Sequence, residues 1–459
     1  MSSPANRLER PPTLVQEEII VQLGTEPGLE SLCQACPSMH SLFKRYETRI
    51  LRRILQNLIT DDEKENIRRD IWAITNIPEA RQRNLPSPTV QLIKSRRSMA
   101  STSWPTHLPS LRSYHRLVSR IVTFIEDFLS KATSKYPPRA YLGLPDLKWG
   151  TRSRFRGRRL DTRLLSFTSL TRSERYRLLR AFIRYELVCL IYRFVNPRSD
   201  ARLDQHVKTF NDFNKGSNAP DLMTFYSAHD YYKSLYGAMF AHCGDAWLPH
   251  TTKGDNKIVF PDDLFVDAYE YFKDLNLGTQ EQPGDLDELA GRGLDLLCST
   301  LGSLSKERSW KHYFKGWLRD FINMSYNTRQ WIIVQDGRQY DHPARNALEG
   351  PFWDELCVRH PKAATTDFCS VIRVYSLYSL EYLRSSQILY MRQVQIYRQR
   401  AWGLLTTEGH ILSPTCISPR SNNYLISMLK SVVVMTGDRG GRSVGKTIGL
   451  TGVLSSLMR

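Results

Sequence analysis

Residues 171–197 read TRSERYRLLRAFIRYELVCLIYRFVNP, and this stretch sets the expectation for the whole fold. Thr171 and Glu174 have the spacing of a capping box, in which the two residues satisfy each other's backbone N–H groups at a helix start. Pro197 ends the pattern, because proline cannot continue a helix. Between them, apolar residues recur every three or four positions, as one face of a helix requires: Leu178, Leu179, Phe182, Ile183, Leu187, Leu190, Ile191 and Phe194.

Similar helical spacing recurs along most of the chain, whereas strand-like runs are few, so the sequence predicts a mainly α fold. Pro, Ser and Arg are concentrated over residues 77–112, which indicates a linker. We expect four parts: a small three-helix module over 8–60, a helix plus this linker over 61–112, a large irregular helical domain for partner recognition over 113–405, and a short, flexible, basic tail over 406–459.

The composition is strongly basic. The 459 residues carry a formal net charge of +18, which is compatible with nucleic acid, anionic lipid or an acidic protein surface and does not choose among them. No secretory signal and no run of about eighteen apolar residues is found, so we expect a protein of the cytoplasm or the nucleus without a membrane span. The eight cysteines are scattered, which favours free thiols over disulfides.

The N-terminal segment, residues 11–59, contains three sets of apolar residues at helical spacing, and a Gly-Thr-Glu-Pro-Gly turn follows the first set. A bundle of three such helices is too small to be very stable by itself, so it gains from docking on another surface. The three sets are Val15, Ile19, Ile20 and Leu23; then Leu29, Leu32, Cys33, Cys36 and Phe43; then Ile50, Leu51, Ile54, Leu55 and Leu58.

This segment resembles the F-box-like modules that open many large filamentous-fungal proteins. The resemblance rests on Pro12, on the runs 19–23, 29–37 and 50–55, and on their spacing. The central stretch LSFTSLTRSERYRLLRAFIRYEL, residues 165–187, is also similar to a helix common in those proteins. The resemblance covers these two segments well and the rest of the chain loosely.

The resemblance implies a non-catalytic adaptor that binds the Skp subunit of a cullin-type ubiquitin ligase, needs no cofactor, and selects a target protein with its central region. Apolar anchors suit such helix-in-groove recognition. A plainer interpretation is that the same residues form only the core of an N-terminal bundle. Carried over by position, the adaptor-facing residues are Pro12, Val15, Ile19, Ile20, Leu23, Leu29 and Leu32.

A second hypothesis comes from RSRFRGRRLDTR, residues 152–163, whose arginines could neutralise a phosphate backbone. It would make the chain a basic nucleic-acid-associated or scaffold protein. A solvated basic loop and an acidic partner protein are equally compatible with the pattern. The candidate polyanion-binding residues are Arg152, Arg154, Arg156, Arg158 and Arg159. The aromatic residues over 224–240, by contrast, have the helical spacing of core residues.

Two catalytic patterns overlap in MTGDRGGRSVGKTIGL, residues 435–450: a phosphate-binding loop over 440–447 and a nucleophile elbow over 441–445. Neither has its context, because no Asp, Glu or His follows Asp438 to bind magnesium or complete a triad. We therefore predict no catalytic residues here and a loosely ordered tail. Cys33, Cys36 and His40 lack a second ligand pair, so we predict no zinc site.

Overall fold

The computed structural model describes residues 11–60, 62, 66–82, 104–147, 150–194, 219–244, 246–249, 265–275, 277, 283–304, 310–323, 395–396 and 398–401. These residues are mainly helical, which confirms the predicted fold class. The helices are α1 (Thr13–Leu23), α2 (Glu26–Ala35), α3 (Pro37–Leu58), α4 (Asn66–Gln82), α6 (Leu108–Ala132), α7 (Pro137–Tyr141), α8 (Arg172–Phe194), α10 (Ala219–Cys243), α11 (Ala268–Lys273), α12 (Pro283–Ala290), α13 (Gly293–Leu304) and α14 (Trp310–Asn323), with a 3-10 turn at Phe167–Ser169.

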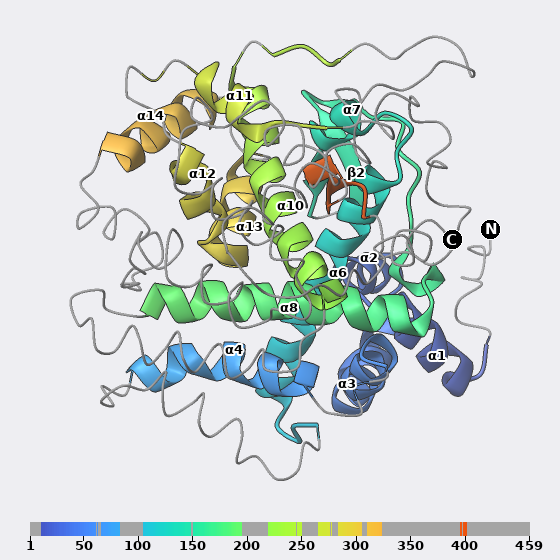
Figure 1. Cartoon of the computed structure of the whole chain (residues 1–459). Coiled ribbons are helices and arrows are strands. Elements are labelled where there is room, and N and C mark those ends of the chain that lie inside the picture. Colours follow the sequence, from blue (N-terminus) through green and yellow to red (C-terminus); the bar gives the residue numbers. More distant parts are fainter. Residues whose placement is uncertain are drawn as a thin grey trace, which may run out of the picture.

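Helix α8 lies at the centre, between α4 on one side and α10 on the other (Figure 1). Its capping box forms as predicted: Thr171 N donates to Glu174 Oε2 at 2.9 Å, and Glu174 N donates to Thr171 Oγ1 at 3.3 Å. The expected one-sided stripe is only part of the pattern, because residues 181–190 are buried all round. Helices α4 and α10 pack on two sides of α8 and so bury both of its faces. Polar side chains in this buried stretch are paired, as where Arg184 Nη2 lies 3.4 Å from Asp70 Oδ2.

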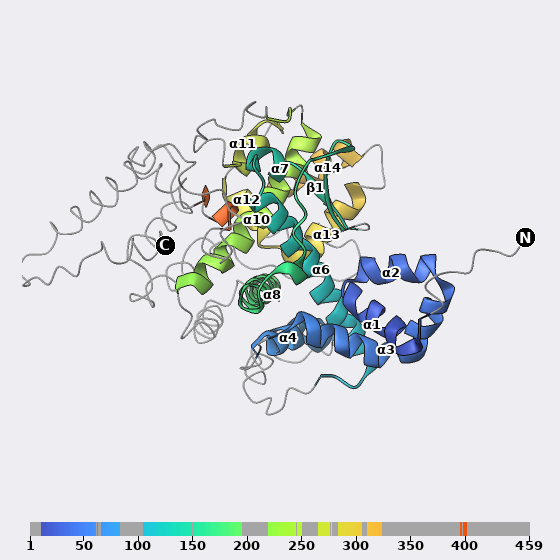
Figure 2. The ribbon, with the colours of Figure 1, turned by 90° about the vertical axis from the view of Figure 1, so that its right-hand side faces the viewer.

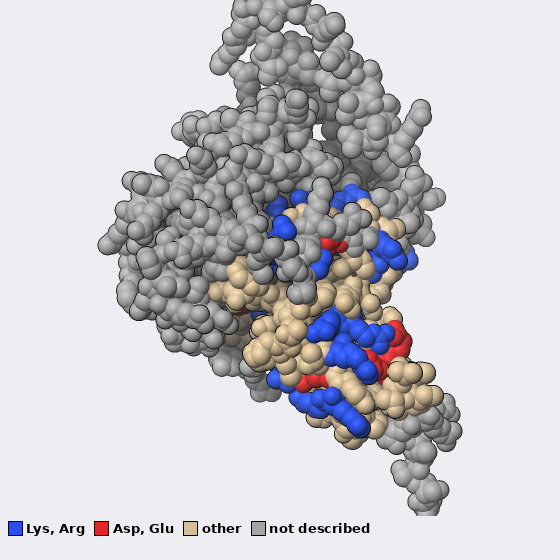
Figure 3. Space-filling model, turned by 90° about the horizontal axis from the view of Figure 1, so that it is seen from below, with Lys and Arg blue, Asp and Glu red and all other residues tan. Residues whose placement is uncertain are grey.

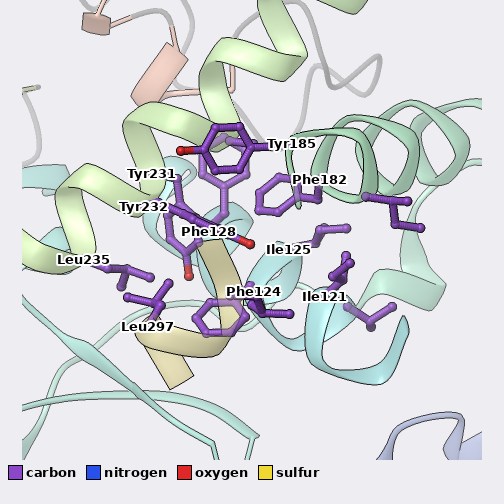
Figure 4. Packing of buried hydrophobic residues seen from close by; sticks show 14 of the residues in the cluster. Ile121, Phe124, Ile125, Phe128, Phe182, Tyr185, Tyr231, Tyr232, Leu235 and Leu297 are labelled. Carbon is purple, nitrogen blue, oxygen red and sulfur yellow. The ribbon is translucent and has the colours of Figure 1, made fainter. Parts of the chain in front are cut away.

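An aromatic cluster joins α6, α8 and α10 (Figure 4). Phe128 of α6 packs against Tyr231 of α10 with ring centroids 5.4 Å apart, and Tyr185 of α8 meets Tyr232 edge-on at 5.1 Å. Such edge-to-face pairs add to the stabilisation from burial. The aromatic residues over 224–240 are therefore core, as predicted, with Tyr231, Tyr232, Tyr236 and Phe240 completely buried.

Helices α1–α3 lie at one end of α6, and α10 lies towards its other end (Figure 2). One continuous set of buried side chains runs from Ile20 in α1 through α6 to Ala401. Phe43, which was expected beside Leu29 and Leu32, lies on α3 because Pro37 already begins that helix. Proline is well suited to a first helical position, where its missing N–H is not needed.

The predicted linker over 77–112 is wrong at both ends. Helix α4 continues to Gln82, and α6 begins at Leu108. Pro109 falls inside the predicted linker, but it occupies the first turn of α6, where proline is favoured. The tail over 406–459, including the two catalytic patterns, lies outside the described residues.

The segment expected as a basic loop forms a small antiparallel sheet of β1 (Leu144–Asp146), β2 (Gly150–Phe155) and β3 (Arg158–Arg159). Phe155 pairs with Arg158 across a two-residue turn. Both turn residues have positive φ, 47° at Arg156 and 81° at Gly157, as a type I′ hairpin requires. The Arg-Gly pair was the sequence signal for this turn.

Within the described ranges, no helix is both long and apolar enough to cross a membrane.

Candidate docking surfaces

Helix α1 has one buried face and one exposed face. Ile20 and Val21 are buried, whereas the side chains of Leu14, Val15 and Leu23 are 75, 47 and 38% exposed. These are three of the six large apolar side chains that are exposed in the part of the chain that the structure describes. Val15 and Leu23, eight residues apart, lie on one face of α1, and apolar side chains exposed together on one face mark interaction sites.

Val15, Ile19 and Leu23 are four residues apart, so they form one stripe along α1. Ile19 is the middle residue of this stripe and packs partly on the core. Leu32 of α2 is also partly buried against the core, and Pro12 is exposed just before α1. We call Pro12, Leu14, Val15, Ile19, Leu23 and Leu32 the α1–α2 edge.

Two of the seven predicted adaptor-facing residues lie elsewhere. Ile20 and Leu29 are buried in the core, so they can support the α1–α2 edge but cannot contact a partner. Leu14 was not among the predicted residues, although it is the most exposed apolar side chain of α1. Neighbouring positions such as Ile19 and Ile20 differ because the packing of α2 and α3 on α1, which helical spacing does not reveal, decides which of them faces inward.

Helix α6 holds the corner between α1 and α2. Gly24 turns the chain there with φ of 67°, a conformation that glycine adopts without strain. Buried His115 Nε2 donates to the carbonyl oxygen of Gly24 at 2.9 Å, and Ser119 Oγ accepts from Glu26 N at 2.5 Å. Burial lowers the pKa of His115, and the hydrogen bond to Gly24 opposes that shift.

Charged pairs hold α1 and α3 together behind the edge. Glu17 is almost completely buried on α1, and its carboxylate receives hydrogen bonds from Arg49 and Arg53 of α3. Arg53 also contacts Glu18 at 2.5 Å. Seen from below, the charged residues of the described surface are mainly Lys and Arg (Figure 3).

The basic hairpin is the second candidate surface. Its arginines do not act alike, because Arg156 Nη2 donates to the carbonyl oxygens of Ala241 and Gly244 at the end of α10. Cations suit a helix C-terminus, so Arg156 serves the fold. Arg154, Arg158 and Arg159 are exposed, and none of the three forms an ion pair with a described residue. The side chain of Arg152 lies outside the described ones.

Cys33, Cys36 and His40 do not lie on one helix, because α2 ends at Ala35 and His40 belongs to α3. Cys36 is buried, with Sγ 3.1 Å from Ser38 Oγ. Burial raises the pKa of Cys33, which disfavours the thiolate that metal binding needs. Among the described residues, no three His, Cys, Asp or Glu side chains are grouped to hold a metal ion.

Comparisons with known proteins identify no relative: no protein-family model, no curated protein and no solved structure matches this chain.

Proposed function

We propose that the chain is a non-catalytic adaptor that binds the Skp subunit of a cullin-type ubiquitin ligase through the α1–α2 edge, and presents a target on its larger helical part. The partner comes from the resemblance of residues 11–59 to F-box-like modules. The observation that supports a docking role is the exposed apolar stripe on a helix whose other face is packed. A helix of this kind buries its apolar stripe in a groove of the partner.

The test is co-purification of the full chain with the Skp adaptor from the same cells. Val15→Asp with Leu23→Asp places two charges on the exposed stripe. Binding would bury these charges without partners, which opposes formation of the complex. Loss of anchor contacts costs about 2 kcal/mol or more, so we expect about 30-fold weaker binding. Ile19 is left unchanged because it also packs on the core.

Leu164→Asp is the matched control, because Leu164 is a similarly exposed leucine, at 42%, outside the α1–α2 edge. It should leave adaptor binding unchanged, and circular dichroism should show native helix content for both variants. Equal recovery of the adaptor by the wild type and the double variant would refute the proposal. So would equal losses in the double variant and in Leu164→Asp.

A further inference from the structure

Trp247 is the most exposed of the large apolar side chains in the described ranges, at 87%. It lies in the segment 246–249, which follows α10. Its neighbours Ala246 and Leu248 pack against a small apolar cluster under the basic hairpin, formed by Leu142, Phe155, Leu160 and Ala241. The indole is therefore directed into solvent between two residues that face the hairpin.

The backbone on both sides of Trp247 is tied to the fold. Arg156 of the hairpin turn binds the carbonyl oxygen of Gly244, and Arg139 Nη1 donates to the carbonyl oxygen of Pro249 at 3.2 Å. A side chain presented on an anchored backbone loses little conformational entropy when a ligand binds. The structure thus exposes a large aromatic surface in a prepared position.

The hairpin on which Ala246 and Leu248 pack carries exposed positive charge. Arg154 and Arg159 are directly opposite each other on β2 and β3. Like charges in this arrangement destabilise a sheet, so an anion bound between them would relieve a cost already present. At the nearby end of α10, burial raises the pKa of Cys243 to about 12, and the cations Lys315, Lys311 and Arg156 all act against that rise.

We propose that Trp247 and the basic hairpin together bind single-stranded nucleic acid. The indole would stack on an unpaired base, and Arg154, Arg158 and Arg159 would neutralise neighbouring phosphates. Aromatic stacking with cations that follow the backbone is the common arrangement for single strands. A base inside a duplex is already stacked, so it cannot use the indole. This surface is separate from the α1–α2 edge and does not depend on adaptor binding.

The test is fluorescence anisotropy of the full chain with a labelled 20-nucleotide poly-dT strand, titrated over a range of salt concentrations. Trp247→Ala should weaken binding about tenfold or more, whereas Trp247→Phe should retain most of it. Arg158→Gln with Arg159→Gln removes two phosphate contacts. It should reduce the slope of log K against log salt by about 1.4.

Lys44→Gln with Arg45→Gln is the matched control, since it removes two exposed charges on α3, away from the hairpin (Figures 1 and 2). We expect little change in binding from this control. An equal loss in the control, equally tight binding of a duplex, or equal displacement by polyglutamate would overturn the assignment. Polyglutamate displacement would indicate an acidic protein as the partner. No binding at low salt would also overturn it.

Discussion

The buried ion pair between Asp127 and Lys131 provides the sharpest test of the core. Both side chains are completely buried on α6, with Lys131 Nζ 2.5 Å from Asp127 Oδ2. The same carboxylate accepts hydrogen bonds from Ser153 Oγ at 2.8 Å and from Tyr231 OH at 2.7 Å. It therefore joins α6, β2 and α10, and burial lowers the pKa of Lys131 while Asp127 opposes that shift.

Lys131→Met keeps the apolar stem and leaves the carboxylate of Asp127 without its counter-charge. Breaking a buried pair in this way costs about 3–5 kcal/mol. For a chain of 459 residues, whose unfolding entropy is about 2.1 cal/mol/K per residue, that lowers the melting temperature by about 3–5 °C. The assay is urea unfolding followed by circular dichroism, with a thermal melt of the same samples. Lys273→Met is the control, because Lys273 pairs with Glu270 on the surface and should change stability by less than about 0.5 kcal/mol.

The double variant Asp127→Asn with Lys131→Met tests the reason for the loss. Asparagine removes the stranded charge. Ser153 and Tyr231 donate to different oxygens of Asp127, so in asparagine the amide oxygen accepts from one hydroxyl and the amide nitrogen donates to the other. We therefore expect the double variant to be more stable than Lys131→Met alone. A double variant less stable than the single one, or a Lys131→Met protein as stable as the wild type, would show that the ion pair does not govern this part of the core.

Three further predictions concern other sites. Gly237→Ala should lower stability by about 1–3 kcal/mol, because its new Cβ would lie 2.7 Å from Ala268, whereas Gly302→Ala has open space and should be neutral or stabilising in urea unfolding. Burial lowers the pKa of His242 to about 4, so between about pH 6.5 and pH 4 the unfolded chain binds a proton that the folded chain does not, and the free energy of unfolding falls. In His242→Gln this fall should be about 3 kcal/mol smaller, and an unchanged pH dependence would contradict the prediction. Thr171→Ala should cost about 1 kcal/mol in the same unfolding assay, and no loss would mean that the capping box does not stabilise α8.

Sequence patterns predicted the features that depend on local spacing. The capping box at Thr171 and the burial of the aromatic residues over 224–240 follow from periodicity and short-range chemistry, and the structure contains both. The dense arginines of 152–163 do not predict the hairpin, because its structural signal is the Arg-Gly turn at Arg156 and Gly157. Charge indicates what a segment can bind, whereas turn residues indicate how it folds.

The candidate surfaces were only partly predictable. The stripe of Val15 and Leu23 could be read from spacing, but the burial of Ile20 depends on helices that arrive later in the sequence. The exposure of Trp247 had no local signal, since tryptophan in an apolar context usually packs inside. It is exposed because its two neighbours are the residues that pack against the hairpin.

Helix α6 contacts both candidate surfaces, through His115 at the α1–α2 corner and through Asp127 at Ser153 of the hairpin. Twelve residues separate these two contacts, which corresponds to about 18 Å along a helix axis. The helix is therefore a rigid spacer of known length. Ligands bound at the two surfaces would be held at a fixed separation. The effective concentration of one ligand near the other would then be set by that distance rather than by free diffusion.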